Sequence, residues 1–540
     1  MRLYRIAGIV AVLFLVGKIA LAKDIYIGQN SSGSSNGTSC ANAYTYTWFN
    51  NAGNWGTGSA QIGPGTTVHV CGIVAGSAGS TVLTFQGSGT VGNPITLLFE
   101  MSAIVQAPYC KSAARGSAGG CISANGKNYV VIDGNGKMGT VQNSLNGAPG
   151  ATCPGGACSY QANSALLDLQ GCNNCIVQNL NILNNYMELQ NVASENSTNE
   201  LAIMMYGSNQ TLANNVFTNC GWCVNFFYAN GNGNFQAYGN SFSTFGHAFA
   251  VAPNTSGASC GAPCTSIHDN VIGPANVNWD ASGCPNHKDG IHYFGNGNSL
   301  QSGTYIYNNQ FSGVWGTCST GFIYTDNVSP YIKDLYMWNN MFNVGQVAEN
   351  TNGWVLVAND GGGVLQSLNN TFIGSGAMDN SLAFAYFSSG NLTVEGNVAT
   401  GIADPIRIEG SVAALTVDYN LYGATECQNG NNCFIWSGAF EGSFSAWKSA
   451  CGCDAHSISN ASPGINADGT LTSTSVARSK SINLSGSATG PLATLAEDTT
   501  DGGTRTPDPR PTTGAWDIGA FAYVGTSVPS APTNLVATPQ

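Results

Sequence analysis

The sequence has 540 residues, and only 8% of them are charged, far below the roughly 25% of a typical soluble chain. Hydrophobic residues make up 43% and aromatic residues 10%, so there is enough apolar material for a core and global disorder is excluded. The formal net charge is −12 at pH 7, which argues against a nucleic-acid partner, because such partners require basic surfaces.

The first residues have the pattern of a secretory signal peptide. Arg2 and Arg5 precede an apolar run over residues 6–16, and an Ala-Leu-Ala sequence at 20–22 matches the small-x-small pattern of signal cleavage. We therefore expect residues 1–22 to be a signal peptide and the mature protein to be secreted or held at the cell surface. No other apolar run approaches about 18 residues, so we expect no membrane span after its removal.

The 18 cysteines are an even number, which in an exported chain indicates a disulfide framework. Many are close neighbours in sequence and suggest local loop bridges. These pairs are Cys110 and Cys121, Cys153 and Cys158, Cys172 and Cys175, Cys220 and Cys223, Cys260 and Cys264, and Cys427 and Cys433. The alternative is that Cys172, Cys175, Cys220 and Cys223 together bind zinc through four thiolates. The spacing of Cys451 and Cys453 is too tight to assign.

A short phrase of the type Asn-Asn-x-Phe recurs after residue 210, about every 29 residues. The asparagines at its equivalent position are Asn215, Asn240, Asn270, Asn309, Asn340, Asn370, Asn397 and Asn420. Short β-branched and aromatic runs fill the intervals, without helical periodicity. This pattern predicts the coils of a parallel β-solenoid, in which the asparagines form a hydrogen-bonded ladder. The aromatic residues two positions later should stack inside the coil; they are Phe217, Phe242, Phe311, Phe342 and Phe372.

The extent of this pattern predicts the domain organisation. The parallel β-helix is expected over residues 125–424, preceded by an N-terminal cap and first β segments at 23–124. Residues 425–524 lack the phrase and are expected to form a C-terminal cap. The tail at 525–540 is rich in proline and polar residues and is expected to be a linker. The predicted fold class is therefore all-β, a right-handed parallel β-helix with capping regions at both ends.

The Asn-Asn-x-Phe coils resemble the right-handed parallel β-helix superfamily of exported bacterial proteins, which has the pectin-lyase-like fold. The phrase Gly-Ala-Trp-Asp-Ile-Gly-Ala-Phe-Ala-Tyr at 514–523 is similar to segments that close many of those helices. Members of this superfamily include polysaccharide lyases, pectin-type glycoside hydrolases and proteins without known activity. The resemblance therefore implies a fold and an extracellular polysaccharide partner, and leaves the reaction open.

One stretch concentrates ionisable side chains in this charge-poor chain. His287, Lys288, Asp289 and His292 lie within six residues, and four of the six histidines, these two with His247 and His268, lie within a short span of sequence. With Ile291 facing the core, strand alternation places His292 outside, and Lys288 and Asp289 are expected in the preceding turn. An acid, a base and a cation would then converge, which predicts general acid and base catalysis. Alternatively, Asp289 simply forms a turn before Gly290.

Alignment of successive coils adds a second set of candidates. It places Asn296, Asp326 and Asp360 at one turn, where they would form a column of oxygen ligands. These residues are candidates for substrate binding, and Asp326 and Asp360 for Ca²⁺ binding or as the second carboxylate of a glycoside hydrolase. The alternative is that Asn and Asp are there because turns favour them. The hydrolase chemistry itself requires no cofactor.

The residues do not reproduce the motifs of the pectin-type hydrolases. Those enzymes carry an Asn-Thr-Asp-Gly turn, an Asp pair, Gly-His-Gly and Arg-Ile-Lys in that order. Here Gly246-His247 precedes Asp289-Gly290, and an Asp pair is absent from the sequence. The catalytic roles of that family are therefore not carried over. Arg407, between the inward-facing Ile406 and Ile408, is expected to be a surface cation and a candidate for substrate binding.

Scarcity of cations bears on the substrate. Between Met138 and Trp447 the sequence contains three Lys or Arg residues, Lys288, Lys333 and Arg407. A lyase acting on a polyuronate must neutralise carboxylates, so a neutral or weakly charged glycan suits the chain better. Five tryptophans are candidates for sugar stacking: Trp222, Trp279, Trp315, Trp338 and Trp354. The leading hypothesis is a secreted glycoside hydrolase; the alternatives are a non-catalytic glycan-binding or adhesive protein and a Ca²⁺-dependent polysaccharide lyase.

Overall fold

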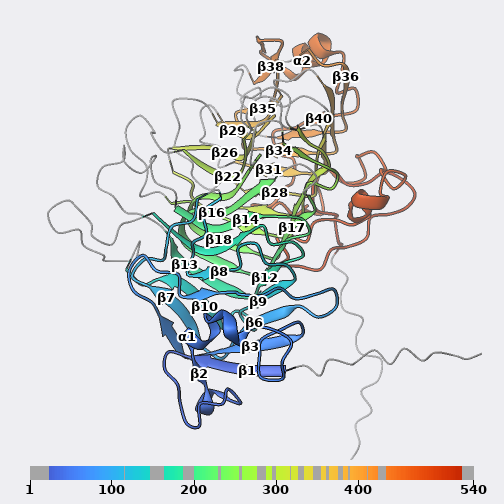
Figure 1. The fold of residues 1–540 in the computed structure, drawn as a ribbon. Coiled ribbons are helices and arrows are strands. Elements are labelled where there is room, and N and C mark those ends of the chain that lie inside the picture. Colours follow the sequence, from blue (N-terminus) through green and yellow to red (C-terminus); the bar gives the residue numbers. More distant parts are fainter. Residues whose placement is uncertain are drawn as a thin grey trace, which may run out of the picture.

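The computed structural model describes residues 23–525, with gaps at 115, 146–162, 186–199, 229–232, 254–257, 277–286, 295–299, 317, 326–331, 333, 344–353, 360–363, 375–380, 387–389, 410 and 424–432. The expected signal peptide and almost all of the expected tail lie outside these residues. The described chain winds into a long stack of coils, from the N-terminal end in blue to the C-terminal end in orange (Figure 1). The strands of neighbouring coils pair in parallel and in register, so the protein is a right-handed parallel β-helix.

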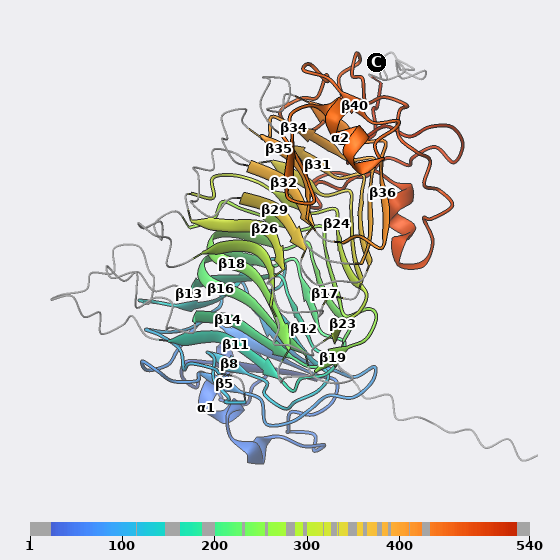
Figure 2. The same ribbon diagram turned by 90° about the horizontal axis from the view of Figure 1, so that it is seen from above.

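The coils stack their strands in three columns. The first sheet contains, in spatial order, β2 Tyr44–Thr45, β1 Lys23–Gly28, β3 Thr66–Cys71, β6 Ile95–Phe99, β9 Val130–Asp133, β12 Ile176–Gln178, β15 Thr211–Ala213, β17 Phe235–Tyr238, β20 Thr265–His268, β24 Thr304–Tyr307, β27 Asp334–Trp338, β30 Val364–Leu368, β33 Asn391–Glu395 and β36 Ala414–Asp418. Seen from above, these strands lie across the coil from the other two columns (Figure 2).

The second and third stacks share two long strands, β16 Val216–Tyr228 and β18 Ser241–Pro253, which run through both. The second stack also contains β4 Ile73–Ala75, β7 Ile104–Ala107, β10 Gly139–Asn143, β13 Leu180–Asn185, β21 Val271–Ile272, β25 Gln310–Phe311, β28 Met341–Asn343, β31 Thr371–Ile373, β34 Val398–Thr400, β37 Leu421–Gly423 and β40 Ile458–Ser459. The third stack also contains β5 Leu83–Thr84, β8 Ile122–Ser123, β11 Ser164–Gln170, β14 Glu200–Tyr206, β22 Lys288–Tyr293, β26 Ser319–Thr325, β29 Trp354–Asn359, β32 Ser381–Tyr386, β35 Asp404–Ile408 and β38 Phe434–Trp436. The stack therefore begins with the strands of residues 23–124, ahead of the first recognisable repeat.

The asparagine ladder is confirmed at every predicted position. Asn340 is typical: its side-chain oxygen accepts from the backbone and side-chain nitrogens of Asn309 at 3.1 and 3.0 Å, and its amide donates to Asn370 at 2.9 Å. Its amide also donates to the Ile306 carbonyl at 2.9 Å. Equivalent links join Asn215 to Asn240, Asn240 to Asn270, Asn270 to Asn309, Asn370 to Asn397 and Asn397 to Asn420. Each bend thereby satisfies backbone groups that leave the strands.

The residue before each ladder asparagine explains the doubled Asn of the phrase. Asn214, Asn339 and Asn369 have φ of 56°, 55° and 51°, in the left-handed region that asparagine tolerates better than most side chains. Inside the coil, the predicted aromatic stack is also present. The ring centroids of Phe342 lie 4.8 Å from Phe311 and 4.5 Å from Phe372, with the rings nearly parallel. The ladder joins the coils from Asn215 to Asn420, and aromatic stacking adds to it where successive coils both carry phenylalanine.

Four of the predicted local disulfides are present: Cys110–Cys121, Cys172–Cys175, Cys220–Cys223 and Cys260–Cys264. Cys40–Cys71 and Cys451–Cys453 are bridged as well. The zinc alternative for the two Cys-x-x-Cys pairs is therefore wrong, since all four thiols are oxidised. The predicted Cys153–Cys158 pair and Cys427 lie outside the described residues.

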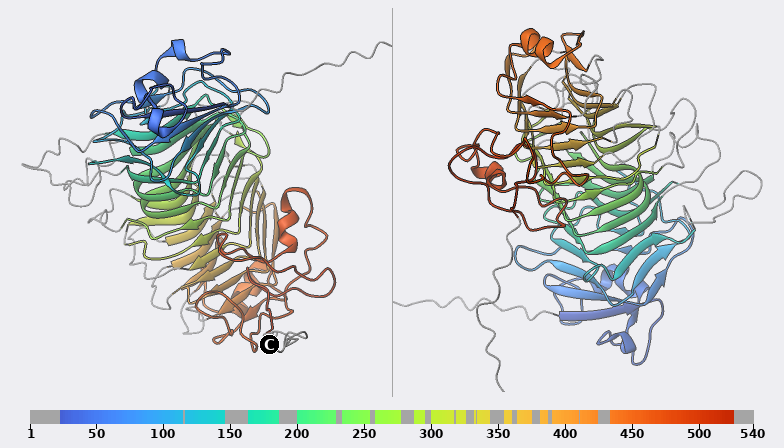
Figure 3. Two further views of the ribbon diagram at one scale, coloured as in Figure 1. Left: turned by 90° about the horizontal axis from the view of Figure 1, so that it is seen from below. Right: turned by 180° about the vertical axis from the view of Figure 1, so that it is seen from behind.

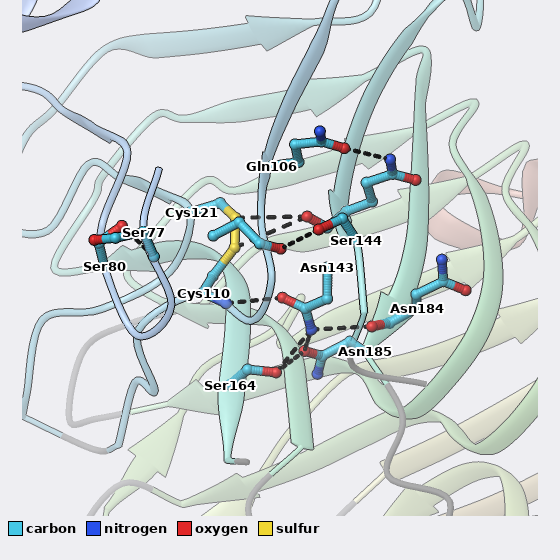
Figure 4. The surroundings of a disulfide bond; sticks show 12 residues. Ser77, Ser80, Gln106, Cys110, Cys121, Asn143, Ser144, Ser164, Asn184 and Asn185 are labelled. Atoms are coloured by element: carbon cyan, nitrogen blue, oxygen red, sulfur yellow. Dashed lines mark hydrogen bonds between the residues drawn. A yellow bond between two sulfur atoms is a disulfide. The ribbon is translucent and has the colours of Figure 1, made fainter. Parts of the chain in front are cut away.

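The bridge at Cys110 sits beside a buried polar network (Figure 4). Asn143 accepts from the Cys110 backbone at 2.9 Å and donates to Asn185 at 3.2 Å on the next coil. In the strand register, Asn185 is paired with Cys220 of the following coil. Cys220 is the first cysteine of another bridge, so the amide pair and that bridge lie in one column. This amide pair lies at a different bend from the main ladder, because the register places Leu180 at the position that precedes Asn215 in the ladder column, and the Leu180 backbone donates to Asn215 at 3.0 Å.

Small elements close the two ends. At the N-terminal end are η1 Cys40–Asn42, η2 Ala52–Asn54 and the short helix α1 Tyr46–Phe49, and at the other end are α2 Phe444–Cys451 and β39 Ala439–Glu441. The buried Asp454 terminates the ladder, since it accepts from Asn420 at 3.3 Å, from Tyr422 at 2.8 Å and from Trp447 at 2.6 Å. A further pair of strands, β19 Ser259–Cys260 and β23 Leu300–Gln301, forms a separate small sheet.

The remainder of the expected C-terminal cap runs back along the side of the helix. We call residues 460–524, which include η7 Gly490–Ala496, the lateral strap; it lies beside the coils in Figure 3. Its buried residues join coil residues in apolar clusters, one of which contains Trp338, Leu368 and Trp516. It reaches coils far from the C-terminal end, because the Gly502 backbone donates to the Asn308 carbonyl at 2.9 Å. Among the described residues, no helix combines the length and apolar character needed to cross a membrane.

Candidate functional site

The strands β18, β22 and β26 of the third stack bring the histidine-rich segment together. Their register places His247 beside Asp289 on neighbouring strands and Ala250 beside His292. The pairing of β22 with β26 shifts between Lys288 and Asp289, where β26 has one extra residue, Thr320. The sequence expectation that Lys288 and Asp289 lie in a turn is wrong, because both are in strand β22.

Gly290 has a packing reason within this strand. A Cβ atom built there would lie 2.4 Å from the Phe322 carbonyl and 2.9 Å from the Phe311 ring. The strand therefore needs glycine to approach the core closely beside Asp289. The alternative in which Asp289-Gly290 is merely a turn is excluded by this position.

Four side chains converge around one carboxylate oxygen. Oδ2 of Asp289 lies 3.2 Å from Nε2 of His247, 3.4 Å from Nε2 of His287 and 3.5 Å from Nδ1 of His292. One ligand atom from each of the four residues falls within 4.8 Å of all the others. We call these four residues the histidine cluster. The ring of His292 is nearly parallel to that of His247 and nearly perpendicular to that of His287.

The cluster is buried on three sides and open on one. The Asp289 carboxylate is fully buried, and the side chains of His247 and His292 are 4% and 6% exposed, whereas that of His287 is 44% exposed. The other carboxylate oxygen, Oδ1 of Asp289, accepts from the Gly321 backbone at 3.1 Å. Solvent and ligands can therefore reach the cluster past His287.

Burial and mutual charge set the protonation states. Burial alone would raise the pKa of Asp289, but the three imidazoles around it lower that pKa to about 2. Burial lowers the pKa of His292 to about 3 and also lowers the pKa of His247, with Asp289 opposing the shift in both cases. The cluster at neutral pH therefore contains an ionised carboxylate beside two neutral buried imidazoles. Asp289 is therefore not suited to donate a proton at neutral pH, and a pKa of about 3 makes His292 a weak proton acceptor.

Aromatic side chains surround the cluster on the outer face of the third stack. The Trp222 ring centroid is 4.7 Å from that of His247, and the Phe294 and Tyr324 centroids are 5.1 and 5.4 Å from that of His292. Trp222, Phe294 and Tyr324 are half-buried, so part of each ring is accessible. Next to them lies a small apolar cluster of Ala113, Ala165, Leu201, Met204, Phe227 and Ala252. A partly apolar surface with a few convergent polar groups is typical of small-molecule and glycan sites.

The other predicted site residues have different outcomes. Lys288 is fully buried in β22, and its Nζ donates to the Asn276 carbonyl at 3.2 Å. Asn296, Asp326 and Asp360 lie outside the described residues, and with them the proposed oxygen column and its Ca²⁺. Arg407 is half-buried and paired with Glu409, four strands further along the third stack than His292 and in the same register column.

The tryptophans considered for sugar stacking differ in their surroundings. Trp222 lies at the cluster, but Trp315 and Trp338 are fully buried in apolar clusters and are unable to stack on a ligand. Trp279 lies outside the described residues, as does the side chain of Trp354. His268, in the ladder phrase, pairs with Asp269 at 2.5 Å and stacks between Tyr238 and Tyr307.

His247 is the member of the cluster that the sequence analysis did not select. It precedes Asp289 by 42 residues, and it enters the site because one coil separates the two positions. The signal was available in the repeat: alignment of Phe249 with Ile291, which are paired in the structure, puts His247 opposite Asp289. The coil between them is longer than the average repeat, which obscured this alignment.

The chain matches no protein-family model and no curated protein sequence. Solved structures resemble it in fold. A mannuronic-acid-specific lyase of polysaccharide family 6 from human gut microbiota has 11% identity, with 82% of this chain and 87% of the other covered and a TM-score of 0.40. The pectate lyase Pel9A has 12% identity over 94% and 97% of the two chains, with a TM-score of 0.39. The GH136 lacto-N-biosidase from Eubacterium ramulus has 12% identity over 74% and 64%, with a TM-score of 0.36.

The parallel β-helix follows from the strand pairing of the chain itself. The identities to these three structures are only 11 to 12%, so the chemistry has to be argued from the site of this β-helix itself.

Proposed function

We propose that this β-helix is an exported carbohydrate-active enzyme that cleaves an extracellular polysaccharide at the histidine cluster. The observation that carries the proposal is the convergence of His247, His287, Asp289 and His292 beside accessible aromatic rings, on the outer face of a chain with few charges elsewhere. Aromatic rings provide a stacking surface for sugar faces, and the cluster provides the polar groups for bond cleavage. The disulfides support an extracellular location, because such bridges persist in oxidising compartments.

We assign hydrolysis of a neutral or weakly charged glycan as the reaction. A lyase must neutralise the substrate carboxylate, which requires a cation at the site. Two of the three cations of the central coils are described, and both are engaged: Lys288 with the Asn276 carbonyl and Arg407 with Glu409. A glycan of several sugars lying along the coil axis would pass from His292 toward Arg407, since both occupy one column.

The test is a panel of neutral and acidic polysaccharides incubated with the purified full-length protein. We expect reducing ends to be released from a neutral glycan, and His292→Ala to lower this rate at least about 100-fold, because the variant removes one of the four groups that converge at the site. His268→Ala is the matched control, since this histidine lies in a different column and should retain activity. Binding without release of reducing ends would support a glycan-binding protein instead. An unsaturated product that absorbs in the ultraviolet would show a lyase.

Trp222→Ala tests the aromatic surface independently of the chemistry. Loss of the ring should raise KM with little change in kcat, because stacking contributes to binding in both ground and transition states. A similar fall in kcat would contradict a pure binding role for Trp222.

A further inference from the structure

The histidine cluster has the ligand types and the spacing of a transition-metal site. Imidazole nitrogens suit Zn²⁺ and its neighbours in the first transition row, and a single carboxylate completes many such sites. A tetrahedral ion with bonds of about 2.0 to 2.1 Å holds its ligand atoms about 3.3 to 3.4 Å apart. The three distances from Oδ2 of Asp289 to the imidazole nitrogens, 3.2, 3.4 and 3.5 Å, have this value.

A second observation separates the cluster from an ordinary buried ion pair. Both ring nitrogens of His247 and Oδ2 of Asp289 are buried, and none of them makes a hydrogen bond of normal geometry with any described residue. Nε2 of His247 and Oδ2 of Asp289 are therefore close together without being aligned as donor and acceptor. Buried polar atoms without hydrogen bonds destabilise the folded protein, and an ion at their common centre would satisfy them together.

The surroundings of the cluster also fit a metal centre. Oδ1 of Asp289 is held by the Gly321 backbone, so Oδ2 is left to point into the cluster, as outer hydrogen bonds orient metal-binding carboxylates. Asp289, His247 and His292 come from paired strands, which fixes their mutual positions before any ion binds. His287 precedes β22 and is partly exposed, so it is the ligand that can move to admit the ion.

We propose that His247, His287, Asp289 and His292 bind one divalent transition-metal ion of the Zn²⁺ type. The proposal concerns the site of the proposed function, but it rests on ligand geometry and is measured without a glycan. It differs from the Ca²⁺ expectation of the sequence, because Ca²⁺ requires six to eight oxygen ligands and this cluster is mostly nitrogen. An ion here would also join β18 to β22 and stabilise the contact between these coils.

The experiment uses the full-length protein without a histidine tag, treated with a chelator and then titrated with Zn²⁺ by calorimetry. We expect one equivalent to bind, and Asp289→Asn and His247→Ala to weaken binding at least about 100-fold. His456→Ala, at an exposed histidine paired with Asp418 in the C-terminal region, is the control and should bind like the parent protein. Absence of binding, equal binding by the cluster variants, or a preference for Ca²⁺ would overturn the proposal.

A second measurement needs no variant. Co²⁺ added to the metal-free parent protein should give visible absorption bands typical of nitrogen-ligated cobalt, and Zn²⁺ should displace them. If the bands do not appear, the proposal fails even where a variant is misfolded. Metal binding without glycan release would contradict only the proposed function, whereas glycan release by a protein that binds no metal would contradict only this inference.

Discussion

Asp501 in the lateral strap is a carboxyl group whose charge opposes folding. Its Oδ1 is buried and has no hydrogen bond to the described residues. Burial raises its pKa from 3.8 to about 6, although Arg505 opposes the shift. Because the folded pKa is above the unfolded value, its contribution to stability is present below about pH 4 and is lost as the pH rises to about 6.

Asp501→Asn should therefore stabilise the protein at pH 7. The side chain is partly exposed, so solvent screening reduces the gain to about 1 kcal/mol in the free energy of unfolding. Asn also suits the backbone, whose φ of 49° lies in the left-handed region. Urea denaturation at pH 7 and pH 4 measures the effect, and the gain should vanish at pH 4. An equal gain at both pH values would show that charge is not its cause.

The residues of the site differ in whether the sequence alone was enough to select them as candidates. His287, Asp289 and His292 could be selected because they lie within six residues of a chain with few charges. His247 required the register between coils, which depends on the length of the intervening loop. Lys288 was expected in a turn, but it lies in strand β22 and its Nζ donates to the Asn276 carbonyl. Proximity in sequence therefore predicted the site, while its membership was decided by strand register.

At the scale of structural elements, the asparagine ladder is the unit that joins successive coils. Asn340 makes hydrogen bonds to Asn309, to Asn370 and to the Ile306 carbonyl, and it is fully buried. The whole ladder could be predicted from the sequence because its signal recurs once per coil and requires no knowledge of loop structure. The coils of residues 23–124 were harder to recognise, since they pair in the same stacks without this asparagine.

Asn340→Ala should lower the free energy of unfolding by about 2 to 4 kcal/mol, because it leaves several buried donors and acceptors without partners. The matched control is Asn391→Ala, an exposed asparagine at the start of β33, for which we expect a change within about 0.5 kcal/mol. Thermal or urea unfolding compares the two variants. Equal effects would mean that the ladder contributes no more than a surface asparagine.

At the scale of the whole molecule, a solenoid is held together by contacts between neighbouring coils alone, and its stability is close to a sum along one axis. The lateral strap changes this arrangement, since it contacts coils from Asp269 to Leu421 with one continuous segment. Its apolar clusters cover side chains of the coils that would otherwise face solvent. The sequence indicated that residues 425–524 leave the repeat, but nothing in its pattern showed that the segment returns along the side.

Trp516→Ala tests this role of the strap. The Trp516 ring is almost fully buried with Trp338 and Leu368 of the coils, and its indole nitrogen donates to the Pro511 carbonyl at 2.7 Å. Truncation of such a buried ring removes about 3 to 5 kcal/mol of local packing, so the strap should open before the coils unfold. We expect limited proteolysis to cut the variant first within residues 460–524 and to leave a resistant core of coils, whereas Phe440→Ala, at an exposed aromatic residue, should be cut like the parent protein. If cleavage of the coils and of the strap accelerates to the same extent, the strap and the coils unfold as one cooperative unit, because opening of the strap would then expose the whole stack.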